Sequence, residues 1–175
     1  MVLGLFNFSK VKTCIIFYFW KRPMNNLSVA RFGNKDKELV ALTFDEGPNP
    51  YFTTRILDIL DTFNIKASFV VIGERCLEYP DILKTICKKG HLIGNHTFSH
   101  KKGDFKACDD IIKSIIGQTC IYVRPPFYDL SLCTEEESYL EDKLIITGDI
   151  DSKDYLPISS REIFKNVVDQ TKNGS

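Results

Sequence analysis

The chain has 175 residues, of which 43% are hydrophobic, and that is enough for one globular domain with its own core. Its 23 basic residues balance its 23 acidic residues, so the formal net charge at pH 7 is zero. Because no net field attracts polyanions, we expect no binding to nucleic acid.

The N-terminal part contains a short apolar run at residues 14–20, preceded by Lys10 and Lys12. The run is too short to cross a bilayer, so we expect no stable transmembrane span. It is compatible with the core of a signal peptide and equally with an apolar N-terminal strand or docking segment. Both interpretations stay open, and we treat residues 1–36 as a leader or docking segment.

From residue 37 onward, strand patterns alternate with helix patterns. Short β-branched or aromatic runs predict strands, at residues 39–44, 67–72, 91–93, 121–123 and 144–146. Apolar residues three and four apart predict helices, at residues 53–63, 80–89 and 105–116 and after a capping box at residues 159–162. The alternation predicts an α/β fold with a parallel sheet or barrel, whose chemistry lies where strands end.

Two of the three histidines, His96 and His100, are four residues apart. If this segment is helical, both imidazoles share one face of the helix. Two imidazoles at that spacing suit one divalent metal ion, with zinc favoured. A pair of surface histidines on a helix explains the spacing equally well.

Asp45 and Glu46 stand at the end of the first predicted strand, just before Gly47 and Pro48. Neighbouring side chains on a strand normally point to opposite faces, but a Gly-Pro turn can break that alternation. One acid would then complete a two-histidine, one-carboxylate metal site, and the other would serve as a general base. Taken alone, the pair is better explained by ordinary turn chemistry.

Further polar residues follow the later strands. Arg124 precedes two prolines that stiffen its loop, so its guanidinium can hold a carboxylate base in place. A structural salt bridge is the alternative for Arg124. Asp149, Asp151 and Asp154 follow the last predicted strand, where a solvated acidic loop is the simpler interpretation.

Four ordered stretches, between about residue 40 and the end of the chain, resemble the motifs of the polysaccharide deacetylases, the NodB-like domain of carbohydrate esterase family four. T-F-D-E-G-P at residues 43–48 resembles the family's T-F-D-D-G-P, and H-T-F-S-H at residues 96–100 resembles H-[ST]-x-x-H. R-P-P-F at residues 124–127 resembles R-x-P-[YF], and D-S-K-D-Y at residues 151–155 resembles D-[ST]-x-D-W. Residues 37–175 are therefore taken as a NodB-like domain.

The resemblance implies a distorted (β/α) barrel, incomplete at its C-terminal end, and metal-dependent removal of acetyl groups from N-acetylglucosamine units of chitin or peptidoglycan. It implies that Asp45 is the general base and that Arg124 orients it. It also implies that Glu46, His96 and His100 hold zinc or another divalent metal.

Three further roles come from the resemblance. The backbone N–H of Phe127 would stabilise the tetrahedral oxyanion. Tyr155 would form an aromatic wall of the acetyl pocket, and Asp154 would belong to a relay that tunes the catalytic acid. The implied partner is a polysaccharide containing N-acetylglucosamine, and we expect a monomer that is secreted or associated with the cell wall.

The sequence departs from the family pattern in ways that bear on activity. Glu46 replaces the usual Asp, and its extra methylene moves the carboxylate by roughly 1.5 Å. Misplacement on that scale costs about a hundredfold in rate. The family's fifth motif, which supplies a His that protonates the leaving amine, is missing, and no His follows His100. Tyr128 and Tyr155 stand where the family has Gly and Trp.

Three interpretations follow. The leading one is a deacetylase of N-acetylglucosamine polymers whose activity is weakened or lost. The second is a catalytically inactive glycan-binding or structural homologue, which the replacement at Glu46 favours. The third is a piece of a longer active enzyme, which the missing fifth motif favours.

Overall fold

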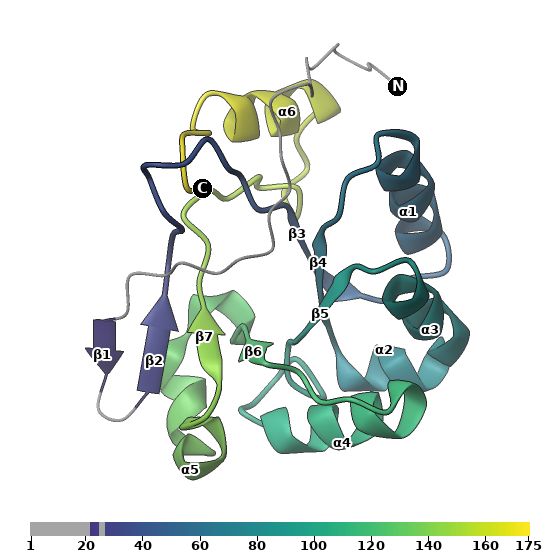
Figure 1. The fold of residues 1–175 in the computed structure, drawn as a ribbon, viewed down its shortest axis with the longest axis vertical. Helices are drawn as coiled ribbons and strands as arrows, with labels where there is room; N and C mark the ends of the chain where they lie inside the picture. The colour runs from purple at the N-terminus through teal and green to yellow at the C-terminus, as the bar shows by residue number, and fades with distance from the viewer. Residues whose placement is uncertain (1–21, 25–26) are drawn as a thin grey trace. The chain divides into compact units, whose positions relative to one another are not determined.

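The computed structural model describes residues 22–24 and 27–175 (Figure 1). These residues form two compact units. The sheet unit contains the described residues up to Ala30 together with Leu42–Thr147, and the terminal unit contains Arg31–Ala41 and Gly148–Ser175. The apolar run at residues 14–20, predicted as a leader or docking segment, lies outside the described residues.

The sheet unit is built on seven strands in the order β1-β2-β7-β6-β5-β4-β3. Their bounds are β1 Arg22–Met24, β2 Leu27–Ala30, β3 Thr43–Gly47, β4 Ser68–Val71, β5 Leu92–Asn95, β6 Tyr122–Val123 and β7 Leu144–Ile146. Every neighbouring pair is parallel except β1 with β2. The predicted α/β fold with a parallel sheet is confirmed. The sheet is open, with β1 and β3 at its edges, as in an incompletely closed barrel.

Helices connect the parallel strands, as parallel pairing requires. In the sheet unit these are α1 Phe52–Thr62, α2 Gly73–Glu78, α3 Pro80–Lys88, α4 Phe105–Ile116 and α5 Glu137–Leu140, with two 3₁₀ turns, η2 Pro126–Tyr128 and η3 Leu130–Thr134. The helices bury apolar side chains such as Leu57, Leu83 and Ile112. All four residues of β4 are buried, which explains why apolar residues follow one another without alternation at positions 69–71.

The terminal unit contains α6, Ser160–Val168, and a turn at the end of the sequence. The predicted capping box is confirmed: the Glu162 N–H donates to the Ser159 hydroxyl, and the Glu162 side chain accepts from the Ser159 N–H. In the turn, the Gly33 N–H donates to the Gly174 carbonyl at 2.7 Å. Gly174 has φ 82°, a conformation that favours glycine.

Most predicted elements are found within one or two residues of their expected bounds, and two differences are informative. The first strand was predicted at residues 39–44 but runs over Thr43–Gly47. Residues 39 and 41 instead hydrogen-bond to the turn at Gly174 and Ser175 within the terminal unit. The prediction also missed β1 and β2, because Leu27–Ala30 is too short to show strand periodicity.

The described cysteines Cys76, Cys87, Cys108, Cys120 and Cys133 are free thiols, and all but Cys87 are buried. Among the helices of the described residues, none combines the length and the apolar character needed to cross a membrane.

Candidate metal centre

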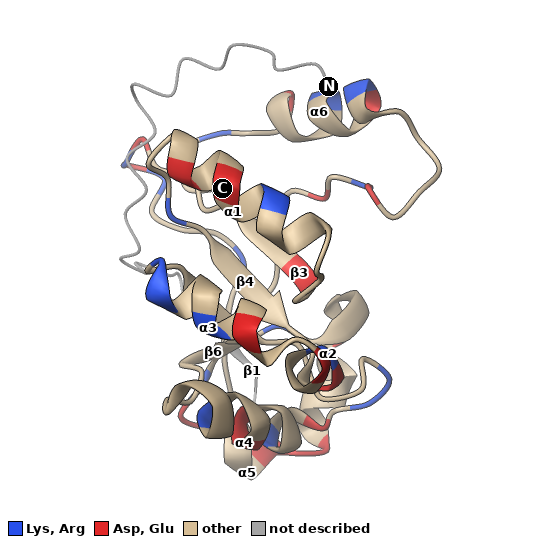
Figure 2. Cartoon of the chain, turned by 90° about the vertical axis from the view of Figure 1, so that its right-hand side faces the viewer, with Lys and Arg blue, Asp and Glu red and all other residues tan. Residues whose placement is uncertain are grey.

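A β-bulge at the end of β3 presents the two neighbouring acids. Asp45 lies opposite Val70 of β4 and Gly47 lies opposite Val71, so Glu46 is the extra residue. Glu46 has φ 65°, which is uncommon outside glycine. The sequence predicts that the Gly-Pro turn breaks the alternation of side chains between the two faces of β3. In the structure this break occurs one residue earlier, at Glu46. Figure 2 shows the acidic pair at the end of β3.

Glu46, His96 and His100 form a group that can hold a metal ion. Each residue offers one ligand atom, and these atoms lie within 4.8 Å of one another. His100 Nε2 is 3.6 Å from Glu46 Oε1. Two ligand atoms on one tetrahedral zinc ion lie about 3.4 Å apart. The Glu46 side chain is 65% exposed and free to adjust, so this donor set fits a divalent metal despite the longer side chain.

The orientation of His96 also suits a metal. Its ring Nδ1 lies 2.7 Å from the backbone carbonyl of Arg124, so Nδ1–H donates there and Nε2 is left as the ligand atom. Burial lowers the pKa of His96, partly opposed by the Asp45 charge and by the hydrogen bond to Arg124. The neutral imidazole that metal binding requires is therefore favoured.

The segment that carries His96 and His100 is an irregular loop, so the conditional prediction of a helix here is wrong. Thr97 and His100 have φ 68° and 60°. Side chains capture the N–H groups that a helix would use internally. Asp104 Oδ1 accepts from the Phe98 N–H at 2.8 Å, and the Thr97 hydroxyl accepts from the His100 N–H at 3.0 Å. The loop still brings the two imidazole centroids within 4.9 Å of each other.

Arg124 forms a short ion pair with Asp45. The guanidinium is 3% exposed, and its Nη1 donates to Asp45 Oδ1 at 2.6 Å and to the Thr43 hydroxyl at 2.9 Å. Its Nε donates to the Ile146 carbonyl at 3.3 Å. Contacts to two strands fix the guanidinium, and a charge-assisted hydrogen bond then fixes the Asp45 carboxylate beside the metal ligands.

Phe127 lies next to His100. Its ring is edge-on to the imidazole with centroids 5.0 Å apart, and the residue is 80% exposed. Its backbone has φ 57° within η2. An exposed aromatic ring beside a ligand is suited to contact a sugar, and the predicted oxyanion role of its N–H group stays a prediction.

The remaining predicted site residues lie in an exposed loop of the terminal unit. Asp154 Oδ1 accepts from the Ser152 hydroxyl at 2.8 Å, and the Tyr155 hydroxyl donates to Asp151 Oδ2 at 3.2 Å. Asp149 forms an ion pair with Lys172 in the same unit, with 3.9 Å between the charged atoms. The roles expected for Asp154 and Tyr155 stay predictions.

The third histidine, His91, is outside the metal group. It precedes β5, is 5% exposed, and its Nδ1 accepts from the Ala67 N–H at 3.2 Å. Its ring packs against Phe69. His91 therefore belongs to the core.

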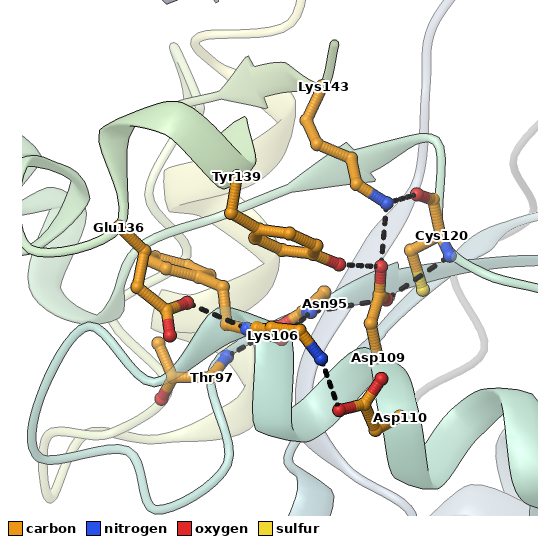
Figure 3. A network of polar contacts seen from close by, with 10 residues as sticks. Asn95, Thr97, Lys106, Asp109, Asp110, Cys120, Glu136, Tyr139 and Lys143 are labelled. Carbon is orange, nitrogen blue, oxygen red and sulfur yellow. Dashed lines mark hydrogen bonds and ion pairs between the residues drawn. The ribbon is translucent and has the colours of Figure 1, made fainter. Parts of the chain in front are cut away.

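The sequence interpretation missed two buried polar residues behind the histidine loop, Asn95 and Asp109 (Figure 3). For Asp109 a signal exists. It lies four residues after Phe105 and three before Ile112, so an acid stands on the apolar face of α4. For Asn95 the sequence offers only its position before His96.

Comparisons with known proteins give the family of this chain. The polysaccharide deacetylase family model matches residues 32–137. Over 153 residues the chain is 32% identical to a peptidoglycan-N-acetylglucosamine deacetylase of Bacillus cereus, which covers 82% of this chain and 56% of the relative. Over 77 residues it is 42% identical to a chitooligosaccharide deacetylase of Rhizobium leguminosarum bv. trifolii, which covers 44% of this chain and 34% of the relative.

A crystal structure of a peptidoglycan N-acetylglucosamine deacetylase superposes with a TM-score of 0.76 at 32% identity, covering 84% of this chain and 73% of that one. The chain spans about half the length, or less, of these two curated relatives. The family model and the structural match agree on the fold and on the region that carries the site. The chain belongs to the polysaccharide deacetylase family.

Proposed function

We propose that this chain is a metal-dependent N-deacetylase of polysaccharides that contain N-acetylglucosamine. The observation that carries this proposal is the juxtaposition of two histidines and one carboxylate with the Asp45–Arg124 ion pair. Membership of the family supports the reaction, and the substrates named for the relatives, peptidoglycan and chitooligosaccharides, support the substrate class.

Glu46, His96 and His100 are assigned as the metal ligands. Zinc is favoured because imidazole nitrogens provide two of the three ligand atoms. A divalent metal bound there supplies a Lewis acid for the acetyl carbonyl and lowers the pKa of a water molecule at its open position.

Asp45 is assigned as the general base. Its Oδ1 is engaged by Arg124, so we assign acceptance of the proton from the attacking water to Oδ2. Arg124 keeps the carboxylate in one orientation throughout, because the guanidinium is itself anchored to Thr43 and Ile146. The Phe127 N–H is assigned to the developing oxyanion, and its ring to the sugar.

The protonation of the leaving amine is not assigned to a histidine. Of the three histidines in the sequence, two are assigned to the metal and His91 belongs to the core. Asp154 and Tyr155 are proposed to act as a relay group and a pocket wall. We place the activity at the cell wall or outside the cell, where the substrate class occurs, and propose that the chain acts as a monomer.

A second candidate is a glycan-binding homologue without catalysis. The position of Glu46 favours it, because this ligand is mostly exposed and lies on a bulge. Such a protein would use the exposed Phe127 to hold a sugar, and a metal bound at the site would serve no catalysis.

Acetate release from peptidoglycan fragments and chitin oligomers by the zinc-loaded chain separates the two candidates. Asp45→Asn should reduce the rate by about 10²–10⁴-fold, because the amide cannot accept a proton. Asp58→Asn, an exposed position on α1, is the matched control and should leave the rate unchanged. Stoichiometric zinc without acetate release would favour the binding protein, and release that survives Asp45→Asn would contradict the assigned base.

A further inference from the structure

A buried carboxylate lies next to the loop that carries His96 and His100. Asp109 of α4 is 1% exposed, and both of its oxygens are used (Figure 3). Oδ2 accepts from Lys143 Nζ at 2.6 Å and from the Tyr139 hydroxyl. Oδ1 accepts from Asn95 Nδ2 and from the Cys120 N–H, each at 3.2 Å. A charge buried this deeply is tolerated only when it is paired and hydrogen-bonded, and here it is both.

The partners of Asp109 determine its protonation state. Burial raises the pKa of Asp109, but the hydrogen bonds from Lys143 and Tyr139 more than offset that effect, so its pKa lies below the usual value. Lys143 also donates to the Cys120 carbonyl at 2.6 Å, which keeps the ammonium in place. Asp109 therefore presents a fixed acceptor to Asn95.

Asn95 connects this carboxylate to the loop that carries His96 and His100. It is the last residue of β5 and is fully buried. Its NH₂ group faces two acceptors, the Phe105 carbonyl at 2.7 Å and Asp109 Oδ1 at 3.2 Å. This arrangement fixes which way the amide points, so its oxygen accepts from the Thr97 N–H at 2.9 Å.

Both histidine ligands depend on Asn95. The hydroxyl of Thr97 accepts from the His100 N–H at 3.0 Å. The backbone carbonyl of Asn95 accepts from the Arg124 N–H at 2.9 Å, and the Arg124 carbonyl accepts from His96 Nδ1. Thr97 and His100 hold left-handed backbone conformations, which persist only where the surroundings impose them.

We propose that Asp109 is a positioning residue of the metal centre: by fixing the Asn95 amide it holds the loop that presents His96 and His100. Lys143 and Tyr139 act through Asp109. The inference rests on the proposed function only in that the ligand set is the one named there. It concerns the affinity for metal, so it holds or fails independently of whether acetate is released.

The first test is the dissociation constant for zinc, measured by competition with a chromophoric chelator. In Asp109→Asn, one carboxylate oxygen becomes an NH₂ group and the other becomes a neutral oxygen, so Asn95 and Lys143 lose a charged acceptor. The loop that carries the histidines is then held less firmly, and zinc binding should weaken by about tenfold or more. Leu83→Ala is the matched control, because this apolar side chain is fully buried on α3 and its loss destabilises the fold without removing a hydrogen bond of the network. It should lower Tm and leave the dissociation constant unchanged.

The second test needs no metal. Hydrogen exchange of the Thr97 and His100 amides in the metal-free chain should be faster in Asp109→Asn, beyond any change shared with Leu83→Ala. Tyr139→Phe removes only one hydroxyl from the network, so it tests the proposal should Asp109→Asn fail to fold, and it should act in the same direction more weakly. Equal exchange in the network variants and in the Leu83→Ala control would overturn the proposal. So would an unchanged zinc affinity, whereas zinc binding without acetate release would overturn only the deacetylase function.

Discussion

Two carboxylate–cation pairs in the sheet unit have the same 2.6 Å separation and very different surroundings. In the Asp45–Arg124 pair the carboxylate side chain is 27% exposed, and Arg124 contacts one of its oxygens. In the Asp109–Lys143 pair the carboxylate side chain is 2% exposed, and each of its two oxygens accepts two hydrogen bonds. A carboxylate in an ion pair can accept a proton from a substrate or water when one of its oxygens is not engaged by the cation. When both oxygens accept hydrogen bonds from the protein, the carboxylate stabilises the fold instead.

The largest expected effect separates the two pairs by activity. Arg124→Gln removes the charged anchor of Asp45 and should lower the rate of acetate release by about a hundredfold, because the base is no longer held in place. The measurement is acetate release at saturating zinc. Lys165→Gln, an exposed lysine of α6, serves as the control, and equal rates for all three proteins would contradict the role given to Arg124.

The next effect concerns stability. Lys143→Met leaves Asp109 buried without its counter-charge and should lower the free energy of unfolding by about 3–5 kcal/mol. Lys106→Met breaks a pair of similar length, Lys106–Asp110, whose side chains are 59% and 62% exposed, and should lower the free energy of unfolding far less because solvent screens this pair. Urea unfolding of both variants checks this. Similar losses would show that burial does not distinguish these pairs.

A smaller effect is expected at the metal ligand itself. Glu46 Oε1 lies 3.6 Å from His100 Nε2, so we expect that its extra methylene does not impair the site. Glu46→Asp should therefore change the zinc dissociation constant by less than about tenfold, whereas Glu46→Gln, which removes the charge, should weaken binding by more than that. A strong gain of affinity in Glu46→Asp would restore the interpretation that the longer arm impairs the site.

The smallest effect is expected at His91, a buried group that forms, among the described residues, no ion pair of the kind that Asp109 forms with Lys143. Burial, reinforced by the Lys66 charge, lowers the pKa of His91 below its usual 6.5. The folded state therefore prefers neutral His91, so the stability that it contributes is present above pH 6.5 and is lost as pH falls toward its folded pKa.

In physical terms, protonation of His91 Nδ1 replaces an acceptor with a donor and breaks the bond from the Ala67 N–H. His91→Gln provides an uncharged acceptor and should flatten the fall in the free energy of unfolding as the pH drops below 6.5. Thermal unfolding at several pH values measures how the free energy of unfolding depends on pH. The same dependence in His91→Gln would contradict the effect assigned to His91.

The sequence predicts the framework of the fold well and the site only in part. Helices such as Phe105–Ile116 carry a strong periodic pattern and a terminal Gly117, so their bounds follow from the residues alone. The conformations of Glu46, Thr97 and His100 do not, because each has a left-handed backbone that local propensity disfavours and tertiary contacts impose. The Asp109–Lys143 pair joins residues 34 positions apart, which no local pattern reveals.

An X-ray absorption spectrum of the zinc-loaded chain shows whether Glu46, His96 and His100 form a metal centre beside Asp45. We expect one zinc per chain with only nitrogen and oxygen neighbours at about 2.0–2.2 Å, including the scattering pattern of imidazole, and loss of that zinc in His96→Ala. The absence of stoichiometric zinc, or a spectrum that requires sulfur at about 2.3 Å from the cysteines, would contradict this expectation.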